Sequence, residues 1–298
     1  MIKERLLLTG AKGQLGCTFS ALFERSDLIN EYELQKVDIE ELDFTDTNSI
    51  SSTLSFYNPS TIINCGAYTA VDQAERHHDL AEKINSEAVA IMTEWAQKER
   101  ARLIQISTDF VFDGNKRTPF RPEDLTKPLG VYGRTKLAGE ECVLNNLGRS
   151  GLVIRTSWLY SEFCSNFVKT MIILMKSKEE INVVNDQVGS PTSTRSLVAL
   201  IFRIIGNKTA SGIFHWSDGA EITWYDFAIE IQKQAFDEGI LKSKIPIRPT
   251  ETSAYPTLAK RPPYSVLDRR KTVEEFGLSG MSWKEELNRV IGEIAKAG

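Results

Sequence analysis

Three evenly spaced glycines follow the first apolar segment of the chain. Residues 5–8 are typical of a β-strand, Gly10, Gly13 and Gly16 come next, and residues 14–25 have an amphipathic helical pattern. In a strand, turn and helix unit the first glycine permits a sharp turn, the second lets backbone N–H groups approach a phosphate, and the third lets the helix lie close to the strand. The spacing departs from the Gly-x-Gly-x-x-Gly fingerprint, so the glycines alone fit either a phosphate-binding loop or a structural turn.

Strand-like and helical segments alternate up to Arg155. The expected strands cover residues 5–8, 33–37, 61–64, 102–107 and 152–155, and the expected helices cover residues 14–25, 49–57, 79–99 and 131–145. Crossovers of this length join parallel strands and place helices on both faces of the sheet. The pattern therefore predicts an α/β fold with a Rossmann-type, doubly wound parallel sheet.

The alternation becomes less regular after Arg155. We expect strands at residues 181–184 and 213–217, helices at 165–178, 193–205, 224–238 and 282–295, and an extended, proline-rich stretch at 246–263. Ser282 and Glu285 have the spacing of a capping box at the start of the last helix. We expect a dinucleotide-binding domain of residues 1–160 plus about 193–217, and a smaller C-terminal substrate-binding lobe of about 161–192 and 218–298.

Charge and composition limit the partners of the chain. Its 298 residues carry a net charge of −4, which provides no attraction for nucleic acid or an anionic membrane surface. No apolar run approaches the roughly 20 residues of a membrane span. The three histidines and four widely separated cysteines do not form a metal-binding pattern. We therefore expect a cytoplasmic protein without nucleic-acid, membrane or metal partners, and a monomer and a homodimer both stay open.

Asp38 follows the second expected strand, 22 residues after Gly16. A carboxylate at this place can accept hydrogen bonds from the hydroxyl groups of an adenosine ribose, which favours NAD. Lys12 in the glycine loop could instead attract the 2′-phosphate of NADP. A solvated charge at a strand end is the alternative for Asp38, and the choice between NADH and NADPH stays open.

Tyr132 and Lys136 stand at positions i and i+4 of an expected helix, which places both side chains on one helix face. An ammonium near a phenol favours the ionised phenol, so we expect Lys136 to lower the pKa of Tyr132. Such a tyrosine can exchange a proton with a carbonyl or an alcohol near neutral pH. Thr108 lies at the carboxyl end of a strand, where parallel sheets bind ligands, and its hydroxyl could orient the same oxygen.

Several motifs together resemble the extended short-chain dehydrogenase/reductase family, and within it the dTDP-4-dehydrorhamnose reductases. The matching stretches run in order through most of the chain: TGAKGQLG (9–16), NCGAYTAVDQAE (64–75), STDFVFDG (107–114), VYGRTKLAGE (131–140), RTSWLY (155–160) and DQVGSPT (186–192). The resemblance implies NADPH- or NADH-dependent reduction of the C4 ketone of dTDP-4-dehydro-6-deoxy-L-mannose to dTDP-L-rhamnose, the last step of dTDP-rhamnose synthesis. The implied partner is therefore a small nucleotide sugar.

The resemblance also implies roles for particular residues. Tyr132 would protonate the C4 oxygen, Lys136 would lower the tyrosine pKa and hold the nicotinamide ribose, and Thr108 would orient the oxygen. The sugar contacts would be Thr108, Asp109 and Trp158. The cofactor contacts would be Gly10, Gly13, Gln14, Leu15, Gly16, Asp38, Asp43, Phe44, Ala67, Tyr68, Thr69, Ile106, Tyr132 and Lys136. Burial in the core is the alternative for Trp158 and Phe44.

Two positions depart from the family pattern. Gly66 stands where relatives more often have alanine, a change expected only to loosen packing. Thr18 stands where some relatives have an acidic residue that is thought to bind Mg²⁺ at a dimer interface, so no interface metal is expected.

Other functions of this fold are the alternatives, and one of them is a 4-ketoreductase that acts on another nucleotide sugar. A dehydratase would need a second acid beside the strand-end threonine, but Phe110 follows Asp109. The sequence does not exclude an epimerase, although the motifs of the reductases make it a weaker interpretation. A non-catalytic NAD(P)-binding regulatory subunit would not need Thr108, Tyr132 and Lys136 together, so their presence favours an enzyme.

Overall fold

A six-stranded parallel sheet forms the centre of the computed structural model, which describes residues 3–278 and 282–297. Its strand order is β10-β5-β4-β3-β1-β2. The strands are β1 (Glu4–Thr9), β2 (Tyr32–Val37), β3 (Thr61–Asn64), β4 (Arg102–Thr108), β5 (Gly151–Thr156) and β10 (Gly212–Trp216). Order and direction confirm the predicted Rossmann-type sheet, and the chain reverses its direction of travel across the sheet between β1 and β3.

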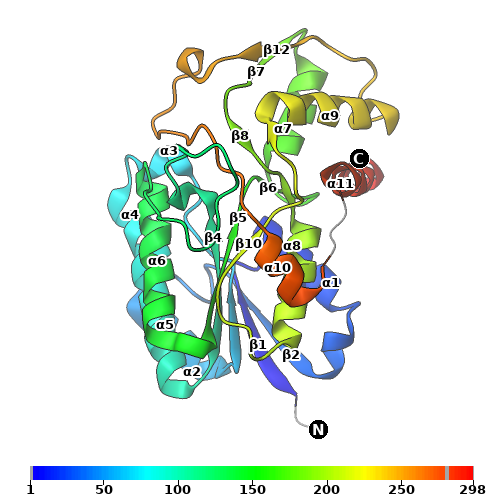
Figure 1. Cartoon of the computed structure of the whole chain (residues 1–298). Helices are drawn as coiled ribbons and strands as arrows, with labels where there is room; N and C mark the ends of the chain where they lie inside the picture. Colours follow the sequence, from blue (N-terminus) through cyan, green and yellow to red (C-terminus); the bar gives the residue numbers. More distant parts are fainter. Residues whose placement is uncertain (1–2, 279–281, 298) are drawn as a thin grey trace.

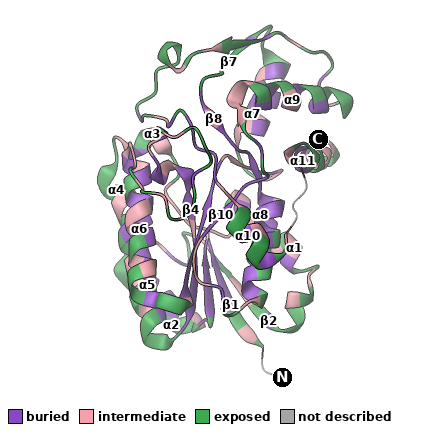
Figure 2. Ribbon diagram, in the orientation of Figure 1, coloured by how far each residue is buried: buried purple, intermediate pink, exposed green. Residues whose placement is uncertain are grey.

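Helices cover both faces of this sheet (Figure 1). One face carries α2 (Thr47–Tyr57), α5 (Ala88–Glu99) and α6 (Val131–Leu147), and the other carries α1 (Gln14–Phe23), α8 (Thr194–Gly206) and α10 (Arg270–Phe276). Successive side chains of a strand point to opposite faces, so Leu6 and Leu8 join the core beneath α1 and α8, whereas Leu7 joins the core beneath α2 and α5. Strands buried on both sides are rich in apolar residues; β3, β4 and β5 are buried along most of their length (Figure 2), whereas the edge strand β2 is partly exposed.

The single helix expected at residues 79–99 is interrupted in the structure. It consists of α4 (His78–Glu82), a π-helical turn η2 (Lys83–Glu87) and α5. The turn buries Asn85, whose side chain accepts a hydrogen bond from Tyr68 N–H at 2.9 Å and donates to Tyr68 O and Thr135 Oγ1, both at 3.1 Å. Such turns often occur at functional sites. Here the turn ties the loop after β3 to α6.

A second core lies beyond the carboxyl ends of the sheet strands. It is formed by α7 (Phe167–Ser177), α9 (Trp224–Asp237) and α11 (Trp283–Ala297). Three short strand pairs accompany these helices: β6 (Leu159–Tyr160) with β9 (Thr192–Ser193), β7 (Ile181–Val184) with β12 (Ile247–Thr250), and β8 (Val188–Gly189) with β11 (Ile222–Thr223). The predicted capping box of α11 is confirmed, because Ser282 N–H donates to Glu285 and Glu285 N–H donates to Ser282 Oγ.

The remaining elements are short. They are α3 (Val71–Ala74), η1 (Asp27–Asn30), η3 (Asp109–Val111), η4 (Gly148–Ser150) and η5 (Thr252–Ala254). The predicted division of the chain into two domains stays a prediction; α10, which it assigns to the C-terminal lobe, packs Val273 and Phe276 into the core of the sheet. Within residues 3–278 and 282–297, no helix combines the length and apolar character needed to cross a membrane.

Candidate active site

The glycine loop between β1 and α1 is too tightly packed for larger residues at two positions. Gly10 has a φ of +62°, and a Cβ on it would lie 2.7 Å from the backbone nitrogen of Gly66. A Cβ on Gly16 would lie 2.3 Å from the carbonyl oxygen of Gly10. The helix therefore begins directly against the strand end, and the free N–H groups of its first turn stand at the cleft, where they can bind phosphate.

A cleft of about 950 Å³ opens at the carboxyl ends of the strands, between the sheet and the second core. Nearly all of the predicted site residues line it: Gly10, Gly13, Gln14, Leu15, Gly16, Asp38, Asp43, Phe44, Ala67, Thr69, Ile106, Thr108, Asp109, Tyr132, Lys136 and Trp158. The structure does not place Tyr68 in this wall. Its ring packs against Ala74, Ala81 and Val131, and its backbone is held by Asn85.

Asp38 lines the cleft next to the glycine loop. Its carboxylate accepts hydrogen bonds from Lys12 N–H at 2.7 Å and Ile39 N–H at 2.9 Å, which tie the end of β2 to the glycine loop. The Lys12 side chain forms an exposed ion pair with Glu40 at 2.6 Å. Asp38 presents a carboxylate here, and the Lys12 ammonium is paired with Glu40, so the choice between NADH and NADPH stays open.

Gly66 has a specific packing role, so the expectation of merely looser packing is wrong. A Cβ at this position would lie 2.7 Å from Cε2 of Phe44. Glycine thus allows the Phe44 ring to lie over the backbone after β3, where the ring forms part of the cleft wall. Asp43, the preceding residue, accepts hydrogen bonds from the backbone and side chain of Thr45, and these bonds lower the pKa of its carboxyl.

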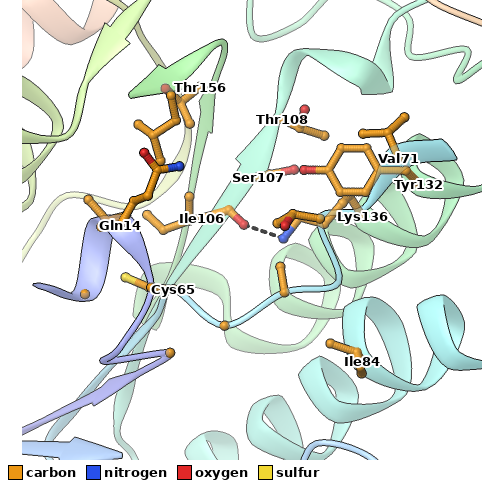
Figure 3. Close-up of a pocket in the computed structure, with 18 of the residues that line it drawn as sticks. Gln14, Cys65, Val71, Ile84, Ile106, Ser107, Thr108, Tyr132, Lys136 and Thr156 are labelled. Atoms are coloured by element: carbon orange, nitrogen blue, oxygen red, sulfur yellow. Dashed lines mark hydrogen bonds between the residues drawn. The ribbon is translucent and has the colours of Figure 1, made fainter. Parts of the chain in front are cut away.

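Tyr132 and Lys136 lie on one face of α6, opposite Thr108 at the end of β4 (Figure 3). Glu75 accepts a hydrogen bond from Val131 N–H at 2.7 Å and so satisfies a free donor at the start of the helix. Lys136 Nζ donates to the carbonyl oxygen of Ile106 at 2.7 Å. The structure thus brings together the three residues predicted to form a proton-transfer site.

A buried ion pair fixes α6 on the sheet. Glu140, one turn after Lys136, receives three hydrogen bonds of 2.7–3.1 Å from the guanidinium of Arg155 on β5. Both side chains are almost fully buried. Removal of one partner from such a pair typically costs about 3–5 kcal/mol, because the other charge remains buried. The sequence analysis did not identify this pair, since neither residue is near the other in sequence.

Burial sets the protonation of the two residues on α6. It raises the pKa of Tyr132 to about 12, and a hydrogen bond with Thr108 only partly opposes this shift. It lowers the pKa of Lys136 to about 8. The expected lowering of the Tyr132 pKa by Lys136 is therefore wrong for this structure, because the ammonium donates to Ile106 rather than to the phenol. The phenol is protonated near neutral pH and can act as an acid.

Asp109 lies directly after Thr108 and is almost fully buried in the cleft wall. Burial raises the pKa of its carboxyl to about 6, although hydrogen bonds from Ser265 and Thr108 oppose this shift. Its Oδ2 atom and Ser107 Oγ have no hydrogen-bond partner among the residues that the structure describes. Buried polar atoms normally have partners, so both are candidates for contact with a ligand.

Trp158 enters the cleft wall from the turn between β5 and β6. Its φ is +46°, a left-handed conformation that is unusual for a bulky residue. The ring stacks on Trp224 with centroids 3.5 Å apart and an interplanar angle of 12°, and a Cβ on Gly189 would lie 2.6 Å from it. The sequence analysis missed Trp224 as a site residue, because an aromatic residue at a helix start is usually part of a core.

Comparison with known proteins places the chain in a family. The family model described as "RmlD substrate binding domain" matches residues 4–296. A dTDP-4-dehydrorhamnose reductase of Aggregatibacter actinomycetemcomitans is 36% identical over 291 residues, covering 96% of this chain and 98% of the relative. The chain belongs to the dTDP-4-dehydrorhamnose reductase family.

The chain is also similar to a solved structure and to a relative that carries a different name. The crystal structure of a dTDP-4-dehydrorhamnose reductase from Bacillus anthracis in complex with NADP matches with a TM-score of 0.90 and 36% identity, covering 98% of this chain and all of that one. A Streptomyces niveus protein named dTDP-4-keto-6-deoxy-D-glucose reductase is 37% identical over 225 residues, 76% of each chain.

Thr18 has a structural role in this member of the family. It is buried, and its hydroxyl lies 2.7 Å from that of Thr194 and donates to Gln14 O, so it joins α1 to α8. Within the described residues there is no group of three or more His, Cys, Asp or Glu side chains that could hold a metal ion.

Proposed function

We propose that this protein reduces the C4 ketone of dTDP-4-dehydro-6-deoxy-L-mannose to give dTDP-L-rhamnose, with NADPH or NADH as the reductant. Family membership and the meeting of Thr108, Tyr132 and Lys136 in the cleft beside the glycine loop support this assignment. The loop fits a dinucleotide. A Cβ on Gly10 or Gly16 would collide with backbone atoms, so glycine at these positions lets the first turn of α1 lie against the end of β1, where its N–H groups can bind phosphate. The expected monomeric or homodimeric state and cytoplasmic location stay predictions.

Each residue of the cofactor side has a proposed task. The first turn of α1, with Gly13, Gln14 and Leu15, binds the pyrophosphate, and Asp38 accepts hydrogen bonds from the adenosine ribose. Asp43 and Phe44 border the adenosine end, and Ala67, Thr69 and Ile106 border the middle of the dinucleotide. When bound, the cofactor supplies a hydride to C4 of the sugar.

The residues of α6 and β4 manage the proton. As the C4 carbonyl accepts a hydride, the electron pair of its π bond moves to the oxygen, which takes the phenolic proton of Tyr132. The phenol is protonated near neutral pH, so it is in the form that can give this proton. Lys136, on the same helix face, holds the nicotinamide ribose, Thr108 orients the oxygen, and Asp109 and Trp158 hold the sugar.

A second candidate is the reduction of dTDP-4-keto-6-deoxy-D-glucose. It is favoured by the Streptomyces niveus relative, which is named for that activity and is 37% identical. The two substrates share the nucleotide and the ketone and differ in sugar configuration. A comparison of kcat/KM for the two keto sugars decides between them.

The decisive experiment is a coupled assay with the purified full chain, in which each keto sugar nucleotide is generated in place and the oxidation of NADH and NADPH is followed. The wild type should oxidise the cofactor only when keto sugar is present. Tyr132→Phe should lower kcat by about 10²–10⁴-fold, because the proton donor is lost, while cofactor binding stays unchanged.

Tyr57→Phe, which removes a phenol on α2 outside the cleft wall, is the matched control and should keep full activity. Full activity in Tyr132→Phe would contradict the assigned proton donor. Absence of turnover with both keto sugars, together with binding to another enzyme, would indicate the regulatory-subunit alternative instead.

A further inference from the structure

Two cysteines that the proposed reaction does not use meet at the glycine loop. Cys17 lies in the first turn of α1, and Cys164 lies in the loop between β6 and α7, at the wall of the cleft. The Sγ atom of Cys17 donates to the carbonyl oxygen of Lys12 at 3.4 Å, and the Sγ atom of Cys164 donates to the same oxygen at 3.3 Å. Two thiols from distant parts of the sequence therefore converge on one atom.

The two thiols differ in their access to solvent. Cys164 is exposed, whereas Cys17 is partly buried. Burial raises the pKa of the Cys17 thiol, and the adjacent Cys164 thiol adds to this shift, so Cys17 is protonated near neutral pH. A dissolved reagent therefore reaches Cys164 first, and Cys17 is the thiol that stands ready to react with its product.

The backbone of Cys164 is held in an unusual conformation. Its φ is +53°, in the left-handed region that favours glycine. Asn166 Nδ2 donates to Gln14 Oε1 at 3.0 Å and to Ser161 O at 2.8 Å, which ties this loop to the start of α1. Strained backbone of this kind is concentrated at functional sites, where the surrounding contacts maintain it. The loop thus presents a nucleophilic side chain to α1 at a position where glycine would be free of strain.

We propose that Cys17 and Cys164 form a redox modification site, at which hydrogen peroxide converts the two thiols into a disulfide between α1 and the loop after β6. The Cys164 thiolate attacks the peroxide, so an S–O bond forms, the O–O bond breaks and hydroxide leaves. Cys17 then attacks the sulfenic sulfur and gives up its proton, so the S–S bond forms, the S–O bond breaks and water leaves. Two thiols and one peroxide give one disulfide and two waters, and two electrons pass from sulfur to oxygen.

Oxidation changes the hydrogen bonding of the glycine loop. A disulfide has no S–H group, so the carbonyl oxygen of Lys12 loses both thiol donors. This carbonyl shares a planar peptide unit with the nitrogen of Gly13, which donates to Gly10 O at 3.0 Å. A change at the carbonyl is therefore transmitted to the loop directly before the N–H groups that we propose bind the pyrophosphate. We expect the oxidised protein to bind the dinucleotide more weakly, whatever the sugar substrate is.

Peptide mapping of the full chain after treatment with hydrogen peroxide tests the site itself. In the wild type, the peptides that contain Cys17 and Cys164 should be joined within one chain, with the loss of two hydrogens, and dithiothreitol should separate them. Cys17→Ser and Cys164→Ser should each abolish this link. Cys142→Ser, which removes a partly buried thiol on α6, is the matched control and should keep it. Sulfinic acid on Cys164 without the link, or links between two chains, would overturn the inference.

Fluorescence titration with NADH, after removal of the peroxide, tests the effect on the cofactor. The Kd of the wild type should rise about tenfold on oxidation and return with dithiothreitol. Cys17→Ser keeps a hydroxyl donor for Lys12 O, so its Kd should equal that of the reduced wild type before and after peroxide. Equal NADH affinity of the reduced and the disulfide-linked wild type would overturn the effect on the cofactor. A disulfide that weakens NADH binding in a chain that reduces neither keto sugar would support this inference while the proposed function fails.

Discussion

The two sides of the cleft are built in different ways. The side that we propose binds the cofactor is made of short segments at the ends of β1, β2 and β3, and glycines and backbone groups form much of its surface. The side that we propose binds the sugar combines Asp109 after β4, Trp158 after β5, Trp224 at the start of α9 and Arg261 from the proline-rich segment. A local motif therefore describes the glycine loop of the first side, although Asp38 and Gly66 from later segments also contact this loop, whereas the second side has no local motif.

This difference predicts how each side responds to mutation. Changes in the glycine loop should affect the cofactor alone, because the N–H groups that we propose bind the pyrophosphate of the cofactor belong to this loop and the first turn of α1. Changes among the aromatic and charged side chains of the other side should affect the sugar nucleotide alone. Any variant that weakens both ligands equally would contradict the division.

The largest effect is expected for Gly16→Ala. The added Cβ would lie 2.3 Å from Gly10 O, so the start of α1 must move away from the strand end. The Kd for NADH should rise about a hundredfold, equivalent to about 2.7 kcal/mol, while dTDP binding changes little. Fluorescence titration measures both. Gly206→Ala is the control, since a Cβ there meets no atom within 4 Å; unchanged NADH binding in Gly16→Ala would show that the tight packing is not needed for the cofactor.

An intermediate effect is expected for Trp224→Ala, which removes the ring stacked on Trp158 at 3.5 Å. Trp158 then loses the support that holds its left-handed backbone, so KM for the keto sugar should rise about tenfold while KM for NADH stays constant. Trp283→Ala, which removes a ring packed on Phe227 outside the cleft wall, is the control for general loosening of the second core. An equal rise of KM in both variants would argue against a specific role for Trp224.

The smallest effect is expected from pH. The pKa of Asp109 is raised to about 6, so its carboxylate accepts hydrogen bonds from sugar hydroxyls above that pH and becomes protonated as the pH falls through it. KM for the keto sugar should therefore rise a few-fold between about pH 7 and 5, with KM for NADH unchanged. Asp109→Asn should remove this dependence. A wild-type pH profile that persists in Asp109→Asn would assign the titration to another group.

Several features were predictable because they depend on residues close in sequence. The strand, glycine turn and helix at residues 5–25, the spacing of Tyr132 and Lys136, and the capping box of Ser282 and Glu285 each follow from local backbone geometry. The π-helical turn at Lys83–Glu87 was not predictable, because residues 79–99 have an ordinary helical pattern and the turn is held by contacts of Asn85 with Tyr68 and Thr135.

The sequence by itself determined the Rossmann-type sheet, the glycine loop and the three candidate residues for proton transfer. The alternation of strand-like and helical segments, the glycines of the turn and the spacing of the motifs are all properties of the chain alone. The tertiary structure decided the protonation of those residues and the composition of the sugar side. Burial raises the pKa of Tyr132 to about 12, and the pairing of Arg261 with Asp72 joins residues 189 positions apart. Desolvation and long-range contact arise only when the chain packs, so neither can be read from local sequence.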